Sequence, residues 1–146
     1  TAMVVTTDCG DSADIHPTNK RPVGERLALA AQAVAYGQKV AYSGPVYKSM
    51  QVKGNTIELS FDHVNKGLMV KGDALTDFEI AGSDKKFVPA KAVIQGDKII
   101  VSSDLIANPA TVRMGWSNVP HINLFNIDGL PASPFRTDNG LNVQSN

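Results

Sequence analysis

The stretches TIELSFDHV (residues 56–64) and KIIVSS (residues 98–103) decide the fold of this 146-residue chain. They are short, rich in apolar and β-branched residues, and follow the two-residue period of a strand with one buried face. Gly-Asn, Gly-Asp and Asn-Pro pairs supply turn chemistry between such runs. Similar strand-like runs cover residues 39–44, 46–54, 67–72, 78–82, 86–96 and 110–118. About eight closely spaced strands without an intervening helix predict a mainly β chain built as an antiparallel β-sandwich.

A different period precedes these strands, between Pro22 and Tyr36. Pro22 suits the first turn of a helix, and Gly37 suits the position just past its end. We therefore expect one helix here, with its alanine-rich face packed on something flat such as a sheet. The apolar residues at helical spacing are Val23, Leu27, Ala30, Ala31 and Val34, with Glu25, Arg26 and Gln32 toward the other side.

The first residues, TAMVVTT (1–7), form an apolar β-branched run and predict a buried strand, followed by a small polar loop. One strand and one helix cannot build a parallel sheet alone. We therefore expect residues 1–37 to be the last strand-loop-helix unit of a larger α/β domain, and residues 38–118 to form the β-sandwich module.

The remaining residues, 119–146, are rich in Pro, Gly and Asn and predict an irregular segment that packs on the domains. Residues 141–146 are expected to fray. The apolar anchors of the segment are Leu124, Phe125, Leu130 and Phe135.

Bulk composition argues against several classes of protein. Fourteen Lys and Arg balance fourteen Asp and Glu, and no basic run occurs, so nucleic acid is a poor partner. No apolar stretch is long enough to span a bilayer, so we expect no membrane partner. Cys9 is the only cysteine, which excludes an internal disulfide, and it is expected to be a small, partly buried residue rather than a nucleophile. His63 and His121 have no partner at zinc-ligand spacing, so surface or hydrogen-bonding roles are expected.

Asp14 and His16 stand together in the loop before the helix. An imidazole titrates near neutrality and can act as the general base of a hydrolase. A neighbouring carboxylate can hold the ring in the required tautomer, and Pro17 restricts the loop. A lone Asp-x-His is a weak signal, and a surface or helix-capping role is the alternative.

The wider stretch GDSADIHPTNKRPVGERLALAAQAVAYG (10–37) resembles the terminal catalytic block of sialate O-acetylesterases, which are SGNH (GDSL-type) carbohydrate esterases. The resemblance continues through SGPVY, FEIAGSDKKFVPAKAVIQGDKIIVSS, VRMGWSN and NLFNIDGLPASPFRTD. It implies that residues 1–37 complete a flavodoxin-like α/β hydrolase domain. It also implies removal of O-acetyl groups from sialic acid or related sugars, no metal or organic cofactor, and a secreted, periplasmic or lysosomal location.

Carried over to this chain, the resemblance makes His16 the general base and Asp14 its orienting carboxylate. The wider family pattern is Asp-x-x-His, which places Ala13 at the acidic position, so Asp11 remains an alternative to Asp14. Ser12 lies only four residues before His16 and is expected to be a loop serine rather than the nucleophile.

The resemblance therefore implies a partner, the N-terminal catalytic portion that bears the serine nucleophile and the oxyanion hole. This chain alone is expected to be inactive. Arg136 could hold a sugar carboxylate or form a structural ion pair, and Trp116 could stack on a sugar or anchor the sheet edge. The alternative function is a non-catalytic carbohydrate-binding or interdomain packing module.

Overall fold

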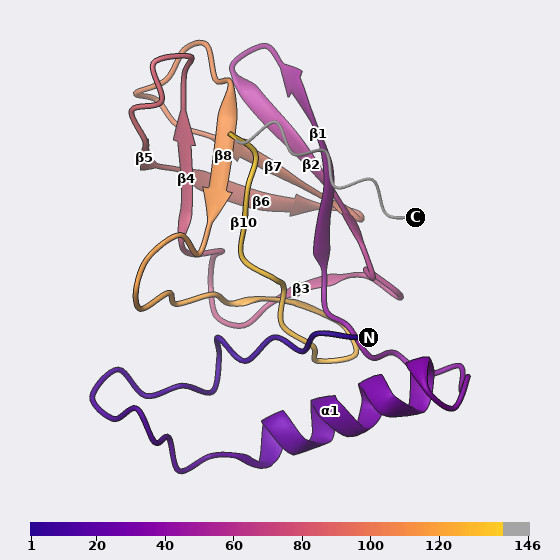
Figure 1. The fold of residues 1–146 in the computed structure, drawn as a ribbon. Helices are drawn as coiled ribbons and strands as arrows, with labels where there is room; N and C mark the ends of the chain where they lie inside the picture. The colour runs from indigo at the N-terminus through magenta and orange to yellow at the C-terminus, as the bar shows by residue number, and fades with distance from the viewer. Residues whose placement is uncertain (139–146) are drawn as a thin grey trace.

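The computed structural model describes residues 1–138 and confirms a mainly β chain with antiparallel sheets (Figure 1). The predicted helix is confirmed as α1 (Arg21–Val34), with Pro22 in its first turn. The strands of the described residues are β1 (Val46–Lys53), β2 (Thr56–Asp62), β3 (Leu68–Val70), β4 (Phe78–Ala81), β5 (Val88–Pro89), β6 (Lys91–Gln95), β7 (Lys98–Ser102), β8 (Thr111–Met114), β9 (Leu124–Asn126) and β10 (Phe135–Arg136).

Two four-stranded sheets carry most of the fold, one in the order β1-β2-β7-β6 and the other in the order β10-β8-β4-β5. Strands β3 and β9 form a separate antiparallel pair. A tight turn joins β1 to β2, where Gly54 takes a φ of 61°, a backbone conformation that residues with a Cβ rarely adopt. The Gly-Asn pair in the sequence thus supplies the turn that was expected of it.

The two large sheets share one hydrophobic core. Ile57 and Leu59 of β2 are fully buried and lie opposite Val101 and Ile99 of β7. The other sheet adds buried residues to the same cluster, namely Phe78, Ile80, Val112, Met114 and Phe135. The alternation of apolar and polar residues along β2 therefore predicted its buried face correctly, because every second side chain of the strand is buried in the core.

Residues 86–96 were expected to form one strand, and this prediction is wrong. Val88 pairs with Ile80 of β4 in one sheet, whereas Ala92 pairs with Val101 of β7 in the other. The chain changes sheet at Ala90, directly after Pro89, which lacks the N–H that a continued ladder needs. Pro89 and the ladders to two different sheets together set this break.

The strand expected at residues 39–44 is absent from the described structure. Single contacts replace a ladder here, since the side-chain amide of Asn126 donates to the Ser43 carbonyl over 3.0 Å. The backbone of Pro131 also packs against Gly44, where a Cβ would stand 2.0 Å from the Pro131 oxygen. This close approach explains why the segment needs glycine.

The C-terminal segment is anchored as its sequence predicts, because its four apolar anchors are all buried. It also contains short strands β9 and β10, which the irregular composition did not indicate. The expected frayed tail at residues 141–146 lies outside the described residues.

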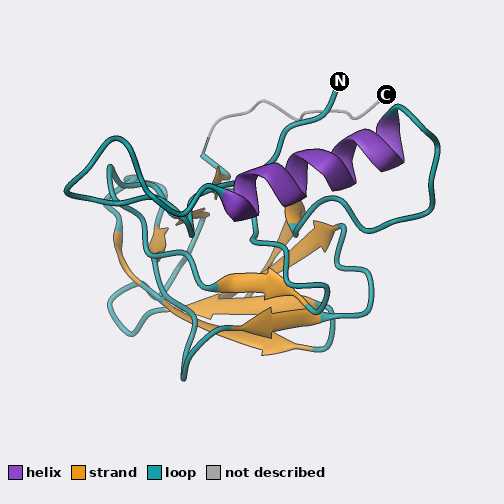
Figure 2. Ribbon diagram, turned by 90° about the horizontal axis from the view of Figure 1, so that it is seen from below, coloured by secondary structure: helices purple, strands orange, loops and turns teal. Residues whose placement is uncertain are grey.

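Helix α1 and the loop before it lie at one end of the β part (Figures 1 and 2). Residues 1–7 form no strand, contrary to prediction, because they find no ladder partner among residues 1–138. No helix in those residues is long and apolar enough to cross a bilayer.

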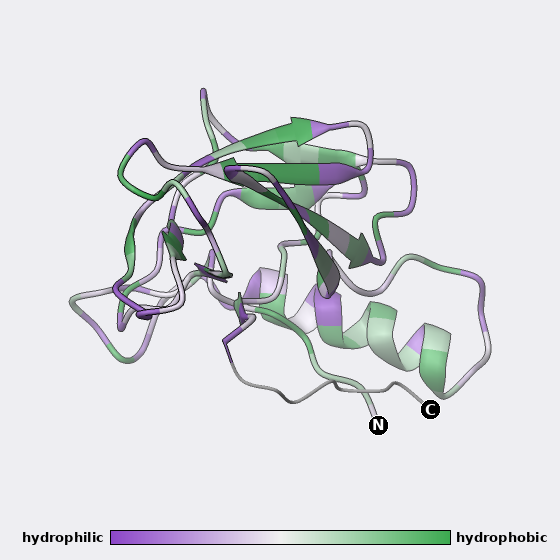
Figure 3. Ribbon diagram, turned by 90° about the horizontal axis from the view of Figure 1, so that it is seen from above, coloured by the Kyte–Doolittle hydropathy of each residue, from purple (hydrophilic) through white to green (hydrophobic). Residues whose placement is uncertain are grey.

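The helix is mostly hydrophobic (Figure 3), but the predicted position of Arg26 is wrong. Arg26, expected on the outer side, is buried together with Ala30. The cause is an ion pair of Arg26, described below, which the hydrophobic pattern does not reveal. Leu27 and Val34, expected to pack on a sheet, are 53% and 46% exposed, so no sheet among residues 1–138 covers them.

Candidate active site

Asp14 and His16 lie in the exposed loop that leads into α1. The Oδ1 atom of Asp14 accepts a hydrogen bond of 2.8 Å from the backbone N–H of His16. This contact fixes the backbone at His16 and leaves its imidazole in solvent. Near the end of the same loop, the Lys20 ammonium donates to the Pro17 carbonyl over 2.9 Å, which closes the turn before the helix.

Asp11, the alternative orienting carboxylate, makes a similar local contact. Its Oδ1 atom accepts a hydrogen bond of 2.8 Å from the backbone N–H of Ala13. Within residues 1–138, neither Asp11 nor Asp14 hydrogen-bonds to the imidazole of His16. Asp14 contacts the backbone of His16 itself and Asp11 contacts that of Ala13, so both carboxylates stay candidates for orienting the imidazole.

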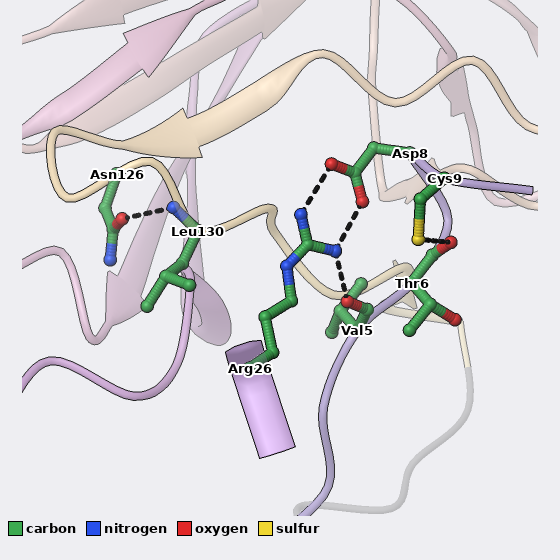
Figure 4. Close-up of polar contacts among 7 residues, drawn as sticks. All are labelled: Val5, Thr6, Asp8, Cys9, Arg26, Asn126 and Leu130. Carbon is green, nitrogen blue, oxygen red and sulfur yellow. Dashed lines mark hydrogen bonds and ion pairs between the residues drawn. The ribbon is translucent and has the colours of Figure 1, made fainter. Parts of the chain in front are cut away.

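The loop is tied to the helix by Arg26 and Asp8 (Figure 4). The Nη1 and Nη2 atoms of Arg26 donate to the two carboxylate oxygens of Asp8 over 2.6 and 2.7 Å. Nη1 also donates to the Val5 carbonyl over 2.7 Å. Both side chains are largely shielded, with 10% of Arg26 and 16% of Asp8 exposed. This two-point geometry is the strong form of an arginine-carboxylate pair.

The electrostatics of the pair agree with its geometry. Burial raises the pKa of the Asp8 carboxyl, but the hydrogen bonds and charge of Arg26 lower it further, so the net pKa falls below its ordinary value of 3.8. The hydrogen bond to Asp8 likewise raises the pKa of Arg26. The hydrophobic pattern of the sequence does not predict this pair. An arginine one turn before buried Ala30 was the available signal, because the two positions share a helix face.

Cys9 and Ser12, the two other reactive side chains of the loop, form no hydrogen bond with His16 in the described part of the chain. The Cys9 thiol donates to the Thr6 carbonyl over 3.3 Å and is partly buried, which agrees with its predicted role (Figure 4). Ser12 is exposed, and no hydrogen bond joins it to His16 within residues 1–138. This arrangement agrees with the prediction that Ser12 is a loop serine.

A cleft of about 760 Å³ opens beside the loop. Residues 6–8 and 10–12 line one part of it and residues 118–123 another, and Lys71 and Phe125 complete the lining. His121, expected in a surface or hydrogen-bonding role, lies in this lining. His63 packs edge-on against the Tyr42 ring, with the ring centroids 5.5 Å apart. Within residues 1–138, no three acidic, cysteine or histidine side chains group as metal ligands.

Arg136 lies away from this cleft lining, in a cluster around Asp138. The Asp138 carboxylate is 4% exposed and lies 2.8 Å from Arg113 Nη2 and 3.0 Å from Arg136 Nε. The Arg136 guanidinium also lies 5.1 Å from the centroid of the exposed Trp116 ring. These contacts match the structural ion pair that the sequence left open, and a role toward a substrate carboxylate stays a prediction.

Comparisons with known proteins support the resemblance read from the sequence. The chain is 52% identical to a carbohydrate acetylesterase from Xanthomonas citri, whose crystal structure superposes with a TM-score of 0.90. That match covers 93% of this chain and 32% of the other. Sialate O-acetylesterases from Mus musculus and Rattus norvegicus are 29% and 30% identical over 132 residues.

The chain spans about a quarter of the length of these curated relatives, since each match covers 82% of this chain and 24% of the relative. No protein-family model matches it. These similarities confirm the predicted relation of the chain to the sialate and carbohydrate acetylesterases.

Proposed function

We propose that this chain, which is related to the sialate and carbohydrate acetylesterases, supplies the histidine and aspartate of a Ser-His-Asp triad. The reaction is hydrolysis of O-acetyl esters on a sugar, and the chain is the C-terminal part of a serine-type esterase. The serine nucleophile and the oxyanion hole come from an N-terminal catalytic portion. The observation that carries the proposal is an exposed imidazole, that of His16, two residues after a carboxylate that already holds its backbone.

In this mechanism His16 accepts the proton of the serine hydroxyl as the serine oxygen bonds to the acetyl carbon. The imidazolium then returns the proton to the sugar oxygen that leaves. A water molecule, deprotonated by the same imidazole, releases acetate from the serine. Asp14 stabilises the imidazolium and fixes its tautomer, and Asp11 is the alternative for this task.

The surroundings of His16 support a partner that brings the serine. A general base must reach the proton it removes, and the exposed imidazole is accessible to a hydroxyl on another part of the protein. The Arg26–Asp8 pair ties the loop to α1, so the imidazole is presented from an anchored segment. Catalysis gains from such fixed positioning of reacting groups.

The outward face of α1 supports the same partner. Leu27, Ala31 and Val34 recur at helical spacing and are all exposed. A continuous apolar stripe of this kind is usually covered in a folded protein. We assign the N-terminal catalytic portion as its cover, since the acetylesterase relatives are three to four times as long as the aligned segment by their covered shares.

Hydrolysis of an acetyl ester tests the proposal. The isolated chain is expected to be inactive, and a protein that joins it to the serine-bearing portion of an acetylesterase is expected to be active. Replacing His16 by alanine in the joined protein separates two functions. Loss of hydrolysis supports the catalytic role, and unchanged hydrolysis supports a non-catalytic binding or packing module. Strong activity of the isolated chain that disappears in Ser12→Ala would overturn the assignment.

A further inference from the structure

We propose that the cleft between residues 6–12 and 118–123 binds a sugar acid, with its carboxylate at Lys71. The sugar class rests on the proposed function, and the site itself rests on the shape and chemistry of the cleft. Its volume of about 760 Å³ falls within the range of small-molecule sites. Asp11 and Ser12 line it, so the cleft adjoins the loop that carries His16.

The first wall of the cleft is held in place by the ion pair of Arg26 and Asp8. Asp8 lines the cleft, and its carboxylate is bound at both oxygens by the arginine. The negative charge of this wall residue is thereby neutralised. The positive charge of Lys71 also attracts the Asp8 carboxylate, which lowers the pKa of that carboxyl a little further.

The second wall is held by side chains of residues 76, 77 and 123. The Asp77 carboxylate accepts a hydrogen bond from the His121 backbone N–H, and the Thr76 hydroxyl donates to the His121 carbonyl. The side-chain amide of Asn123 donates to the Lys71 and Ala74 carbonyls over 3.2 and 2.8 Å. These bonds fix both the wall and the backbone at Lys71. A cleft fixed before a ligand arrives loses less entropy on binding.

The charge of the cleft favours a ligand with one carboxylate and several hydroxyls. Lys71 Nζ lies 3.6 Å from the centroid of the Phe125 ring, and within residues 1–138 the lysine forms no ion pair. It is therefore the cation of the lining that can receive an anion. Asp11, which also lines the cleft, can accept hydrogen bonds from sugar hydroxyls, and the Asn118 and His121 side chains can exchange further ones.

Lys71 fits this task better than Arg136, the cation that the sequence singled out. The Arg136 guanidinium faces the nearly buried Asp138 carboxylate 3.0 Å away, so a substrate carboxylate there would meet a negative charge. The proposal therefore places recognition of the acidic group in the cleft beside the loop.

A titration of the 146-residue chain tests the inference. The ¹⁵N-labelled protein is titrated with the methyl glycoside of N-acetylneuraminic acid and with the methyl ester of that glycoside, which differs by the loss of one charge. We expect saturable amide shifts at Lys71 and at residues 118–123, with roughly millimolar affinity for the acid. The ester is expected to bind about fivefold more weakly or worse, because it lacks the charge that Lys71 pairs with.

Two variants complete the test. Lys71→Met is expected to abolish the preference for the acid, whereas Lys91→Met, an exposed lysine on β6, is expected to keep it. A dispersed spectrum of each variant verifies folding. Equal affinity for acid and ester in the unchanged protein overturns the role of Lys71, and absence of shifts in the cleft overturns the site.

The outcomes also separate this inference from the proposed function. Saturable shifts in the cleft, combined with full hydrolysis by His16→Ala in the joined protein, support the cleft and overturn the triad. Absence of shifts, combined with lost hydrolysis, does the reverse.

Discussion

Arg26 and Asp8 form a two-point ion pair that joins the helix to the start of the loop bearing Asp14 and His16. The two residues are 18 positions apart, and their side-chain atoms meet at 2.6 and 2.7 Å. The pair closes the loop at its base, so the loop gives up much of its conformational freedom before any partner binds. Arg26 and Asp8, which have no assigned step in the proposed reaction, thus restrict the positions that His16 can take.

Asp8→Asn is expected to loosen this loop. The variant keeps the size of the side chain but removes its charge and leaves the largely shielded Arg26 without its counterion. We expect the free energy of unfolding to fall by about 1–3 kcal/mol, as for a lost charged hydrogen bond. Hydrogen exchange is expected to quicken at residues 9–20. Urea unfolding and exchange mass spectrometry measure the two effects.

The matched control is Arg21→Gln, which removes an exposed ion pair to Glu25 on the same helix. Such pairs contribute little, so the control is expected to leave both measurements close to those of the unchanged protein. Equal effects of the two substitutions would mean that the Arg26–Asp8 pair does not restrain the loop.

The pair also predicts a dependence of stability on pH. The folded-state pKa of Asp8 lies below its ordinary value of 3.8. The stabilisation is therefore present above that value and is lost as the pH falls through the folded-state pKa. We expect the stability difference between the unchanged protein and Asp8→Asn to be large near pH 6 and to shrink at a pH well below 3.8. Urea unfolding at both pH values checks this, and a constant difference would argue against an ionised Asp8.

Two leucines are expected to differ sharply when each is replaced by alanine. Leu59 is fully buried in the shared core, so Leu59→Ala should cost about 2–5 kcal/mol. Leu27 is 53% exposed, so Leu27→Ala should cost under about 1 kcal/mol in the isolated chain. In the joined protein the cost at Leu27 should rise if the N-terminal portion covers this face. Thermal unfolding of both forms makes the comparison, and an unchanged cost would remove that support for the docking face.

Local patterns predicted much of the β part. The alternation in residues 56–64 places Ile57 and Leu59 inward, and the structure buries both. Pro89 was a local signal for the break at Ala90, but the sheet that each half joins depends on which distant strands pair with it. The strand predicted at residues 39–44 is absent for a related reason. A strand-like sequence forms a strand only where a neighbouring strand pairs with it.

The candidate site likewise contains residues that a local motif predicts and residues that only the fold brings together. Asp14 and His16 lie two positions apart in the sequence, so a short motif was enough to propose them as the orienting carboxylate and the general base. The Arg26–Asp8 pair joins positions that no local period relates, so the hydrophobic pattern placed Arg26 wrongly on the outer side of α1. Lys71 reaches the cleft only through folding, because it directly follows β3 while the walls come from residues near the two ends of the chain.

The orienting carboxylate is predicted to be Asp14 rather than Asp11. In the joined protein, Asp14→Asn should lower kcat strongly with a small effect on KM, because an asparagine does not stabilise the imidazolium. Asp11→Asn should change kcat little, and a change in KM would agree with its place in the cleft lining. Steady-state kinetics on an acetylated sugar decide between them, and the opposite ranking of kcat would assign the role to Asp11.

The most direct test of the account is the turnover number of His16→Ala in the joined protein, measured beside His63→Ala. His63 packs against Tyr42 and has no part in the proposed chemistry. The account predicts that His16→Ala lowers kcat by about 10³-fold or more while the His63 variant remains close to the unchanged enzyme. A His16→Ala enzyme that turns over within a few-fold of the unchanged protein would contradict it.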